Sequence, residues 1–142
     1  MDYSLGLLKP DCIERDLIDT VLDIVRAEGL DIVLTKQLRL NQDLIDLFYP
    51  QCKPHSYYQG LCEHLLSGPV FVYIVRGEGA IARLNRVVGI NDPSKSPEGT
   101  IRNMGQDIRR NLAHSSENFD QFFREAVMIF SKEEIVGLLQ HV

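Results

Sequence analysis

A run of six almost entirely apolar residues near the middle of the chain, 70–75, limits the choice of fold more than any other segment. It reads Val-Phe-Val-Tyr-Ile-Val and follows Ser67-Gly68-Pro69. Strands buried on both faces appear in sequence as nearly continuous apolar runs. The run therefore predicts a central strand of a β-sheet.

Three further strands are predicted, at 3–8, 32–40 and 126–130. In the second of these, apolar residues recur at even spacing, which is typical of a half-buried strand. Helices are expected from a cap at Asp16 to a stop at Gly29, from a cap at Asn41 to near residue 49, and at 57–66, 79–88 and 118–125. Ser131 and Glu134 form a capping box for a terminal helix.

Four strands connected by crossover helices indicate a single α+β domain over residues 1–142. We expect a ferredoxin-like, four-stranded antiparallel sheet (a split βαβ arrangement) with helices on one face. An open doubly wound sheet is less favoured because the first strand is not followed by a glycine-rich turn. The segment 89–99 has no regular pattern, and so long a loop in a compact domain is typical of a functional site.

Composition excludes several functional classes. Of the 142 residues, 44% are apolar and 25% are charged, and no stretch reaches the length of a membrane span. The beginning of the chain lacks the pattern of a secretory signal, and the three cysteines lack metal-ligand spacing, so we expect a cytoplasmic protein with no membrane partner. The net charge of −5 argues against binding nucleic acid. An anionic ligand would require cations gathered locally.

One of the four histidines has a neighbourhood suited to phosphate chemistry. His114 follows Arg109-Arg110-Asn111 and precedes Ser115-Ser116, whose hydroxyls we expect to cap the helix that starts near residue 118. An imidazole there can act as a nucleophile or a general base, and a helix N-terminus favours phosphate. A structural histidine is the alternative. Of the other histidines, His55 is assigned to a loop, His64 to a helix surface and His141 to the chain end.

Four segments in order resemble the nucleoside diphosphate kinase family over nearly the whole chain. They are Leu8-Lys9-Pro10-Asp11, Ser67-Gly68-Pro69-Val70, the segment Pro-Glu-Gly-Thr-Ile-Arg at 97–102, and Asn-Leu-Ala-His-Ser-Ser-Glu at 111–117. The resemblance implies a kinase that moves the terminal phosphate of ATP or another nucleoside triphosphate to a nucleoside diphosphate by a ping-pong mechanism. It also implies Mg²⁺ carried on the nucleotide phosphates, without protein metal ligands, and a homo-oligomer, either a tetramer or a hexamer.

The resemblance also implies the site residues. His114 would be the phosphorylated nucleophile, and Glu125 and Ser116 would orient its ring. The residues expected to contact the nucleotide, through its base, sugar or phosphates, are Lys9, Tyr49, Tyr57, Leu61, Asn91, Arg102 and Asn111, together with Asn85 or Arg86. Of this set, Tyr57 would stack on the base, Leu61 would pack beside it, and Arg102 would neutralise the transferred phosphate.

Several positions depart from the family pattern. A phosphate-binding arginine of the family aligns with Asn85, and Arg86 is its neighbour, so either the helix register shifts or the site has lost a cation. Asn91 replaces a threonine, and Asn103-Met104 replaces Gly-Asp. The loop before Tyr57 lacks the usual arginine-proline pair. A catalytically weak or inactive nucleotide-binding or scaffold protein of the same fold is therefore the alternative.

Overall fold

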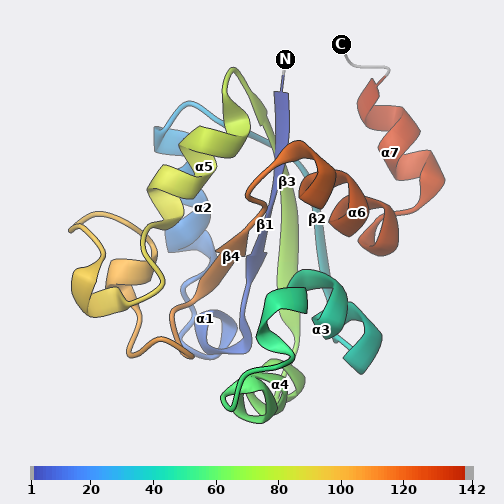
Figure 1. Cartoon of the computed structure of the whole chain (residues 1–142). Coiled ribbons are helices and arrows are strands. Elements are labelled where there is room, and N and C mark those ends of the chain that lie inside the picture. Colours follow the sequence, from blue (N-terminus) through green and yellow to red (C-terminus); the bar gives the residue numbers. More distant parts are fainter. Residues whose placement is uncertain (1, 140–142) are drawn as a thin grey trace.

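The computed structural model describes residues 2–139 and contains a four-stranded antiparallel sheet (Figure 1). The strands are β1 (Asp2–Leu8), β2 (Asp31–Leu38), β3 (Val70–Gly77) and β4 (Ala113–Ser115). Their spatial order is β2-β3-β1-β4, with every neighbouring pair antiparallel. This confirms the α+β class, the ferredoxin-like sheet and the central position of the apolar run. The expectation for His141 lies outside the described residues.

Helices cover both faces of the sheet, so the expectation of helices on one face was wrong (Figure 1). The apolar core around α2 (Ile18–Ala27) and α5 (Ala80–Val88) lies on one face, and the core around α3 (Gln42–Phe48), α4 (Tyr58–Leu66) and α6 (Phe119–Ile129) lies on the other. Alternate residues of a strand point to opposite faces. Val72 and Ile74 therefore join one core, and Tyr73 and Val75 join the other.

The ring of Tyr73 on β3 lies against Gly6 on β1, a position where only glycine leaves enough room. A Cβ atom placed on Gly6 would lie 2.6 Å from Cε1 of Tyr73, its partner across the strand pair. The absence of a side chain leaves room for the buried tyrosine ring. This close approach helps to fix β1, whose C-terminal end leads directly into the site described below.

The strand expected at 126–130 was wrong, because these residues continue and end α6. Phe122, Ala126 and Ile129 are buried at helical spacing and pack on the sheet. The fourth strand is instead β4, three residues long, which pairs with the end of β1. A strand of three residues has too little sequence to show an alternating pattern.

Helix caps account for several element boundaries. The side chain of Asn41 accepts a hydrogen bond from the Leu44 N–H (2.9 Å), which confirms the cap of α3. The Ser131–Glu134 capping box is also confirmed by bonds of 2.9 and 3.1 Å at the start of α7 (Lys132–Leu139). Asp16 is not a cap, because it lies between α1 (Pro10–Glu14) and α2 with a φ of 57°.

The segment between α5 and β4 contains only short 3-10 turns, Pro93–Lys95 and Arg102–Met104, as expected of an irregular segment. It projects from the β4 edge of the sheet, next to α1 (Figure 1). Among residues 2–139, no helix has the length and apolar character needed to cross a membrane.

Candidate active site

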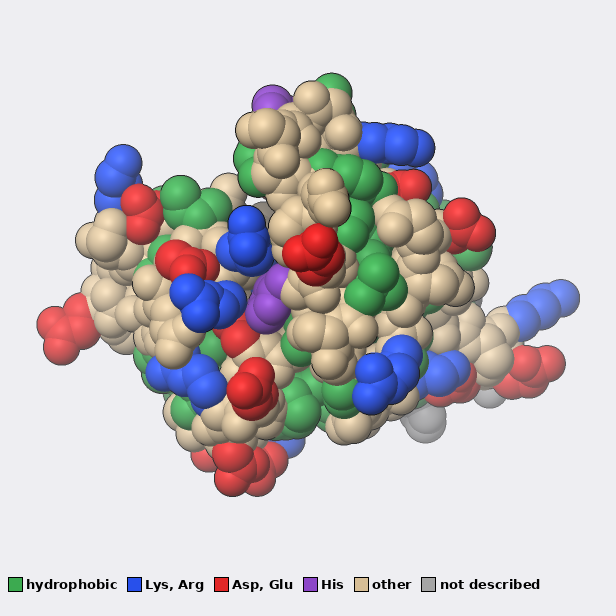
Figure 2. All heavy atoms as spheres, turned by 90° about the horizontal axis from the view of Figure 1, so that it is seen from below, with side chains coloured by type: hydrophobic (Ala, Val, Ile, Leu, Met, Phe, Trp, Pro, Cys, Tyr) green, Lys and Arg blue, Asp and Glu red, His purple; other side chains and the backbone are tan. Residues whose placement is uncertain are grey.

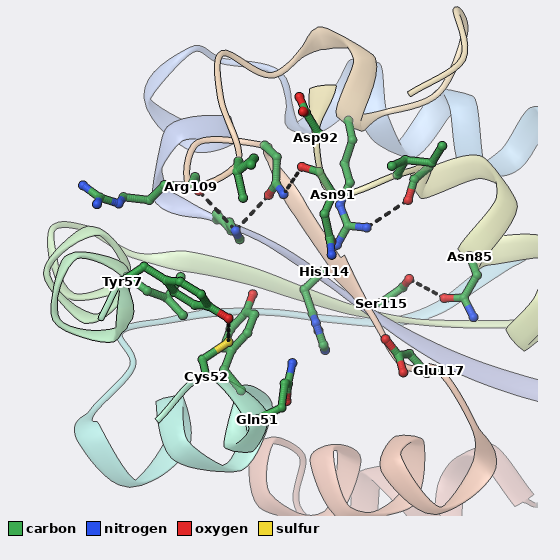
Figure 3. Close-up of a pocket in the computed structure, with 18 of the residues that line it drawn as sticks. Gln51, Cys52, Tyr57, Asn85, Asn91, Asp92, Arg109, His114, Ser115 and Glu117 are labelled. Atoms are coloured by element: carbon green, nitrogen blue, oxygen red, sulfur yellow. Dashed lines mark hydrogen bonds between the residues drawn. The ribbon is translucent and has the colours of Figure 1, made fainter. Parts of the chain in front are cut away.

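A cavity lies where the end of β1, the strand β4 and the segment after α5 meet. Its walls also include the α3–α4 connection and the first half of α6, so segments far apart in sequence contribute to one site (Figure 3). In the view from below, Lys and Arg side chains gather around a hollow in which a histidine is visible (Figure 2). An acidic chain has therefore concentrated cations at one place.

His114 lies on β4, opposite Leu7 of β1, and its side chain points into the cavity (Figure 3). Its Nε2 atom is 3.0 Å from Oε2 of Glu125, which is completely buried on α6. The hydroxyl of Ser116 donates to Oε1 of the same carboxylate at 2.7 Å. The amide of Gln121 donates to Oε2 at 3.1 Å. The ring is therefore held through Nε2, and Nδ1 is the ring nitrogen left for chemistry.

The hydroxyls that follow His114 do not cap α6, which corrects the expectation from sequence. Ser115 donates to Oδ1 of Asn85 at 2.6 Å, and Ser116 donates to Glu125. The side chain of Asn118 caps the helix instead, by accepting a hydrogen bond from the Gln121 N–H (2.8 Å). His114 is positioned by the strand and by α6, rather than by a helix N-terminus.

Two aromatic rings from the end of α3 enclose the imidazole of His114. The Phe48 ring meets it edge-on at a centroid distance of 5.5 Å, and the Tyr49 ring lies at 5.1 Å. Burial raises the pKa of the Tyr49 hydroxyl. This hydroxyl is buried and has no hydrogen-bond partner among the described residues. A buried donor in a cavity wall needs a partner, and a bound oxygen atom can supply one.

Two cations lie beside the histidine. Nζ of Lys9, at the end of β1, donates to Oδ1 of Asn111 at 2.8 Å and to the carbonyl of Arg109 at 3.2 Å. Burial, and secondarily the charge of Arg102, lowers the pKa of Lys9 to about 8. Arg102 donates to the carbonyls of Gly89 (2.9 Å) and Ala113 (3.1 Å), and burial lowers its pKa. Both cations are thus fixed by acceptors that leave their charge available to an anion.

Asn91 and Asn111 connect the irregular segment to this group. The side-chain amide of Asn111 donates to the Asn91 carbonyl at 2.9 Å, while its oxygen receives the bond from Lys9. Both asparagines line the cavity. The Asn111 side chain therefore links Asn91 to Lys9 at the end of β1.

Tyr57 and Leu61, at and after the start of α4, line the far end of the cavity. The Tyr57 ring is half-exposed, and its hydroxyl donates to the sulfur of Cys52 at 3.7 Å. The ring of His55 stacks against it, with a centroid distance of 5.0 Å and an angle of 6°. This stack was not predicted, because the sequence placed His55 only in a loop.

Of the two neighbours on α5, Asn85 lines the cavity and Arg86 does not. Arg86 instead forms an ion pair with Glu28 on the other side of the helix. Consecutive helical residues differ by about 100° in direction. The register has not shifted, so Arg86 is not brought to the site, and the position facing the cavity holds a neutral amide.

The sequence motifs also contain Asp11, whose contacts were not predicted. Asp11, on α1, accepts a hydrogen bond from the backbone N–H of Leu112 at 3.1 Å and lies 3.1 Å from Nε2 of His64. His64 is largely buried by this contact and is not simply a surface residue. Asp11 was noted only as part of the Lys-Pro-Asp segment, and its partners are brought to it by tertiary structure.

Proteins of known function resemble this chain over nearly its whole length. Residues 2–135 match the family model described as nucleoside diphosphate kinase. The chain belongs to the nucleoside diphosphate kinase family. It is 36% identical over 138 residues to a nucleoside diphosphate kinase of Rhodopseudomonas palustris, covering 96% of this chain and 99% of that relative. It is 34% identical to one of Chlorobium limicola, covering 96% and 98%.

Solved structures of the nucleoside diphosphate kinase family have the same fold. The enzyme of Aquifex aeolicus superposes with a TM-score of 0.86 at 30% identity, covering 94% of this chain and 97% of that one. A halophilic nucleoside diphosphate kinase from Halobacterium salinarum, in complex with CDP, gives 0.87 at 29% identity and covers 94% and 90%. The chain is therefore a nucleotide-binding phosphotransferase, a nucleoside diphosphate kinase, as the sequence predicted.

Proposed function

We propose that His114 carries the phosphoryl group between nucleotides. Nδ1 attacks the γ-phosphorus of a nucleoside triphosphate, the bond from that phosphorus to the β,γ-bridging oxygen breaks, and the diphosphate leaves with the bond's electron pair. A second diphosphate then attacks the phosphohistidine through a terminal oxygen, which regenerates the imidazole. The observation that carries the proposal is the fixed Nε2 contact with the buried Glu125, because it leaves Nδ1 free.

The roles of Glu125 and Ser116 follow from this contact. A neutral imidazole with its proton on Nε2 donates to the carboxylate and keeps the lone pair on Nδ1. As Nδ1 becomes bonded to phosphorus, the ring gains positive charge, which the Glu125 carboxylate stabilises. Ser116 and Gln121 hold that carboxylate in place. These residues supply orientation and charge, which phosphoryl transfer needs more than further covalent groups.

The cations and the unpaired hydroxyl would bind the phosphates. Lys9 and Arg102 carry positive charge into the cavity, and the Tyr49 hydroxyl is a buried donor without a partner among the described residues. A terminal phosphoryl group spreads negative charge over three oxygens, which suits several donors around it. Asn91 and Asn111 offer further hydrogen bonds to phosphate or sugar. Tyr57 and Leu61 would hold the base, since stacking on an aromatic ring accepts any base.

Magnesium fits as an ion that enters with the nucleotide. Glu117 and Asp92 are carboxylates in the cavity wall, and the structure brings no group of three His, Cys, Asp or Glu together as a metal site within residues 2–139. Mg²⁺ commonly keeps several waters and binds through phosphates plus one or two carboxylates. When bound, the ion would neutralise the negative charge that develops on the phosphate oxygens.

We also propose that the chain acts as a homo-oligomer, a tetramer or a hexamer, as the family resemblance implies. The feature that supports association is an exposed apolar stripe on α6, formed by Phe119, Phe123 and Val127. Exposed patches of this kind are typical of contact surfaces. Light scattering of the purified chain would give the mass, and a monomer at micromolar concentration would contradict the proposal.

The experiment that tests the catalytic proposal is labelling with γ-labelled ATP and magnesium. The natural protein should take up label that is lost in acid, kept in base and passed on to added diphosphate. His114→Ala should take up none, and His141→Ala is the matched control that should label fully. Nucleotide binding without labelling of the natural protein would support the alternative of a weak or inactive binding protein, for which the neutral Asn85 is the specific observation.

A further inference from the structure

We infer that Arg109 reads the edge of the nucleobase and favours a carbonyl oxygen over an amino group. The inference depends on the base position proposed above, beside Tyr57. Arg109 lines the same cavity and belongs to the segment between α5 and β4. The carbonyl in question is O6 of a purine or O4 of a pyrimidine.

The first observation is that the Tyr57 ring is already fixed before a base arrives. His55 stacks on one face, and the hydroxyl is bonded to Cys52, so an exposed side chain has little freedom to turn. The face away from His55 remains for a ligand. A flat base that stacks there has its plane fixed, so the groups on its edge lie in that plane.

The second observation is that Arg109 reaches across to the same helix. Its backbone N–H donates to Asp107 at 3.1 Å, and its carbonyl accepts from Lys9 at 3.2 Å, so the main chain is held on both sides of the Arg109 Cα atom. Its guanidinium rests against Gly60, where a Cβ atom would lie 2.7 Å from Cζ. Figure 3 shows Arg109 and Tyr57 at one end of the cavity, away from Asn85 and Ser115.

Gly60 lies between Tyr57 and Leu61 on α4, so the guanidinium rests beside the two residues expected to hold the base. Arginine has five N–H donors and no acceptor. A carbonyl oxygen on the base edge can accept a hydrogen bond from the guanidinium. An amino group at the same position is itself a donor, so it cannot form that bond. Hydrogen bonds to charged groups are the stronger ones. The side chain therefore distinguishes hypoxanthine, guanine and uracil from adenine and cytosine.

The test compares diphosphates that differ mainly at this one position. IDP and ADP form one matched pair, and UDP and CDP form the other. In the natural protein kcat/KM should be about five- to tenfold higher for the carbonyl member of each pair, as expected for one partly exposed charged hydrogen bond. In Arg109→Ala both ratios should fall to about one, within roughly twofold. Equal values for the natural protein would overturn the inference.

Two further variants separate base reading from simple charge. Gly60→Ala keeps Arg109 and suits a helix, but its methyl group displaces the guanidinium, so both ratios should fall. Arg110→Ala removes the same charge from the next residue, which pairs with Asp107 and does not line the cavity, and should keep both ratios. Loss of the ratios in Arg110→Ala, or their retention in Gly60→Ala, contradicts base reading.

A phosphate-binding role for Arg109 predicts a different result. In that case Arg109→Ala would lower kcat/KM equally for all four diphosphates. The ratio within each pair would not change, and this result would overturn the inference. Equilibrium binding of the same four diphosphates gives the ratios without turnover. If no diphosphate is phosphorylated, the proposed catalytic function fails, while the binding ratios still decide whether Arg109 reads the base.

Discussion

The carboxylate of Asp11 accepts a hydrogen bond from the backbone N–H of Leu112, 101 residues further along the chain, at 3.1 Å. Leu112 is completely buried and has a φ of 75°, in the left-handed region that a leucine rarely adopts. Its carbonyl accepts from the Lys9 N–H at 2.8 Å. These two bonds hold the C-terminal end of β1 against the start of β4, at a residue two positions before His114.

Asp11→Ala should therefore destabilise the fold and slow the phosphorylation of His114. The Leu112 N–H would be left buried without its acceptor, which costs about 1–3 kcal/mol. The same change removes the partner of His64. Urea unfolding would measure the loss of stability, and single-turnover labelling would measure the rate. Asp11→Asn retains an acceptor oxygen and should lose less of both, so equal losses in the two variants would contradict this account.

Glu125→Gln should reduce the rate of phosphohistidine formation while leaving nucleotide affinity nearly unchanged. The new amide can donate to Nε2 of His114, which favours the tautomer with its proton on Nδ1, where the lone pair is needed. A tautomer error of this kind in a hydrolytic triad costs about 10⁴-fold, and we expect roughly 10²- to 10⁴-fold here. Rapid-quench labelling measures the rate.

Ser116→Ala provides the graded comparison for that experiment. It leaves the carboxylate of Glu125 in place but removes one of the bonds that orient it. The rate should fall by about tenfold, corresponding to a single hydrogen bond. If Ser116→Ala reduced the rate more than Glu125→Gln, the serine would have a more direct part than orientation.

The affinity for nucleotide should decrease as the pH rises through about 8. The pKa of Lys9 is lowered to about 8, chiefly by burial, so the ammonium is mostly charged at neutral pH and mostly neutral about one unit above that pKa. Loss of the charge weakens the attraction to phosphate, so kcat/KM of the free enzyme should fall on the alkaline side. Lys9→Arg remains charged and should show no such fall in this range, whatever its absolute activity.

Asn85→Arg should raise kcat/KM for the nucleoside triphosphate by about tenfold. Asn85 faces the cavity, where a guanidinium would add a charge next to the phosphates. Its neighbour provides the control, because Arg86 pairs with Glu28 outside the cavity. Arg86→Ala should change kcat/KM by less than about twofold, as surface changes usually do. A larger effect in Arg86→Ala than in Asn85→Arg would mean that α5 turns when nucleotide binds.

The sequence alone predicted the features that depend on neighbouring residues. The apolar run at 70–75 indicated the central strand, Asn41 indicated the start of α3, and Ser131 with Glu134 indicated the start of α7. The ordered motifs indicated the family, and the resemblance implied that His114 is the nucleophile. Local patterns of this kind are reliable because the physical causes, burial of a face and satisfaction of free N–H groups, act within a few residues.

The tertiary structure decided what depends on contacts between distant segments. The apolar residues at 126–130 have strand-like composition, but packing of Phe122, Ala126 and Ile129 on the sheet makes them part of a helix. The strand that holds His114 exists only because three residues pair with β1. Likewise, the way α5 packs on the sheet turns Asn85 toward the cavity and Arg86 away from it, toward Glu28. The sequence determines which side chains are present, whereas contacts between distant segments determine which way those side chains face.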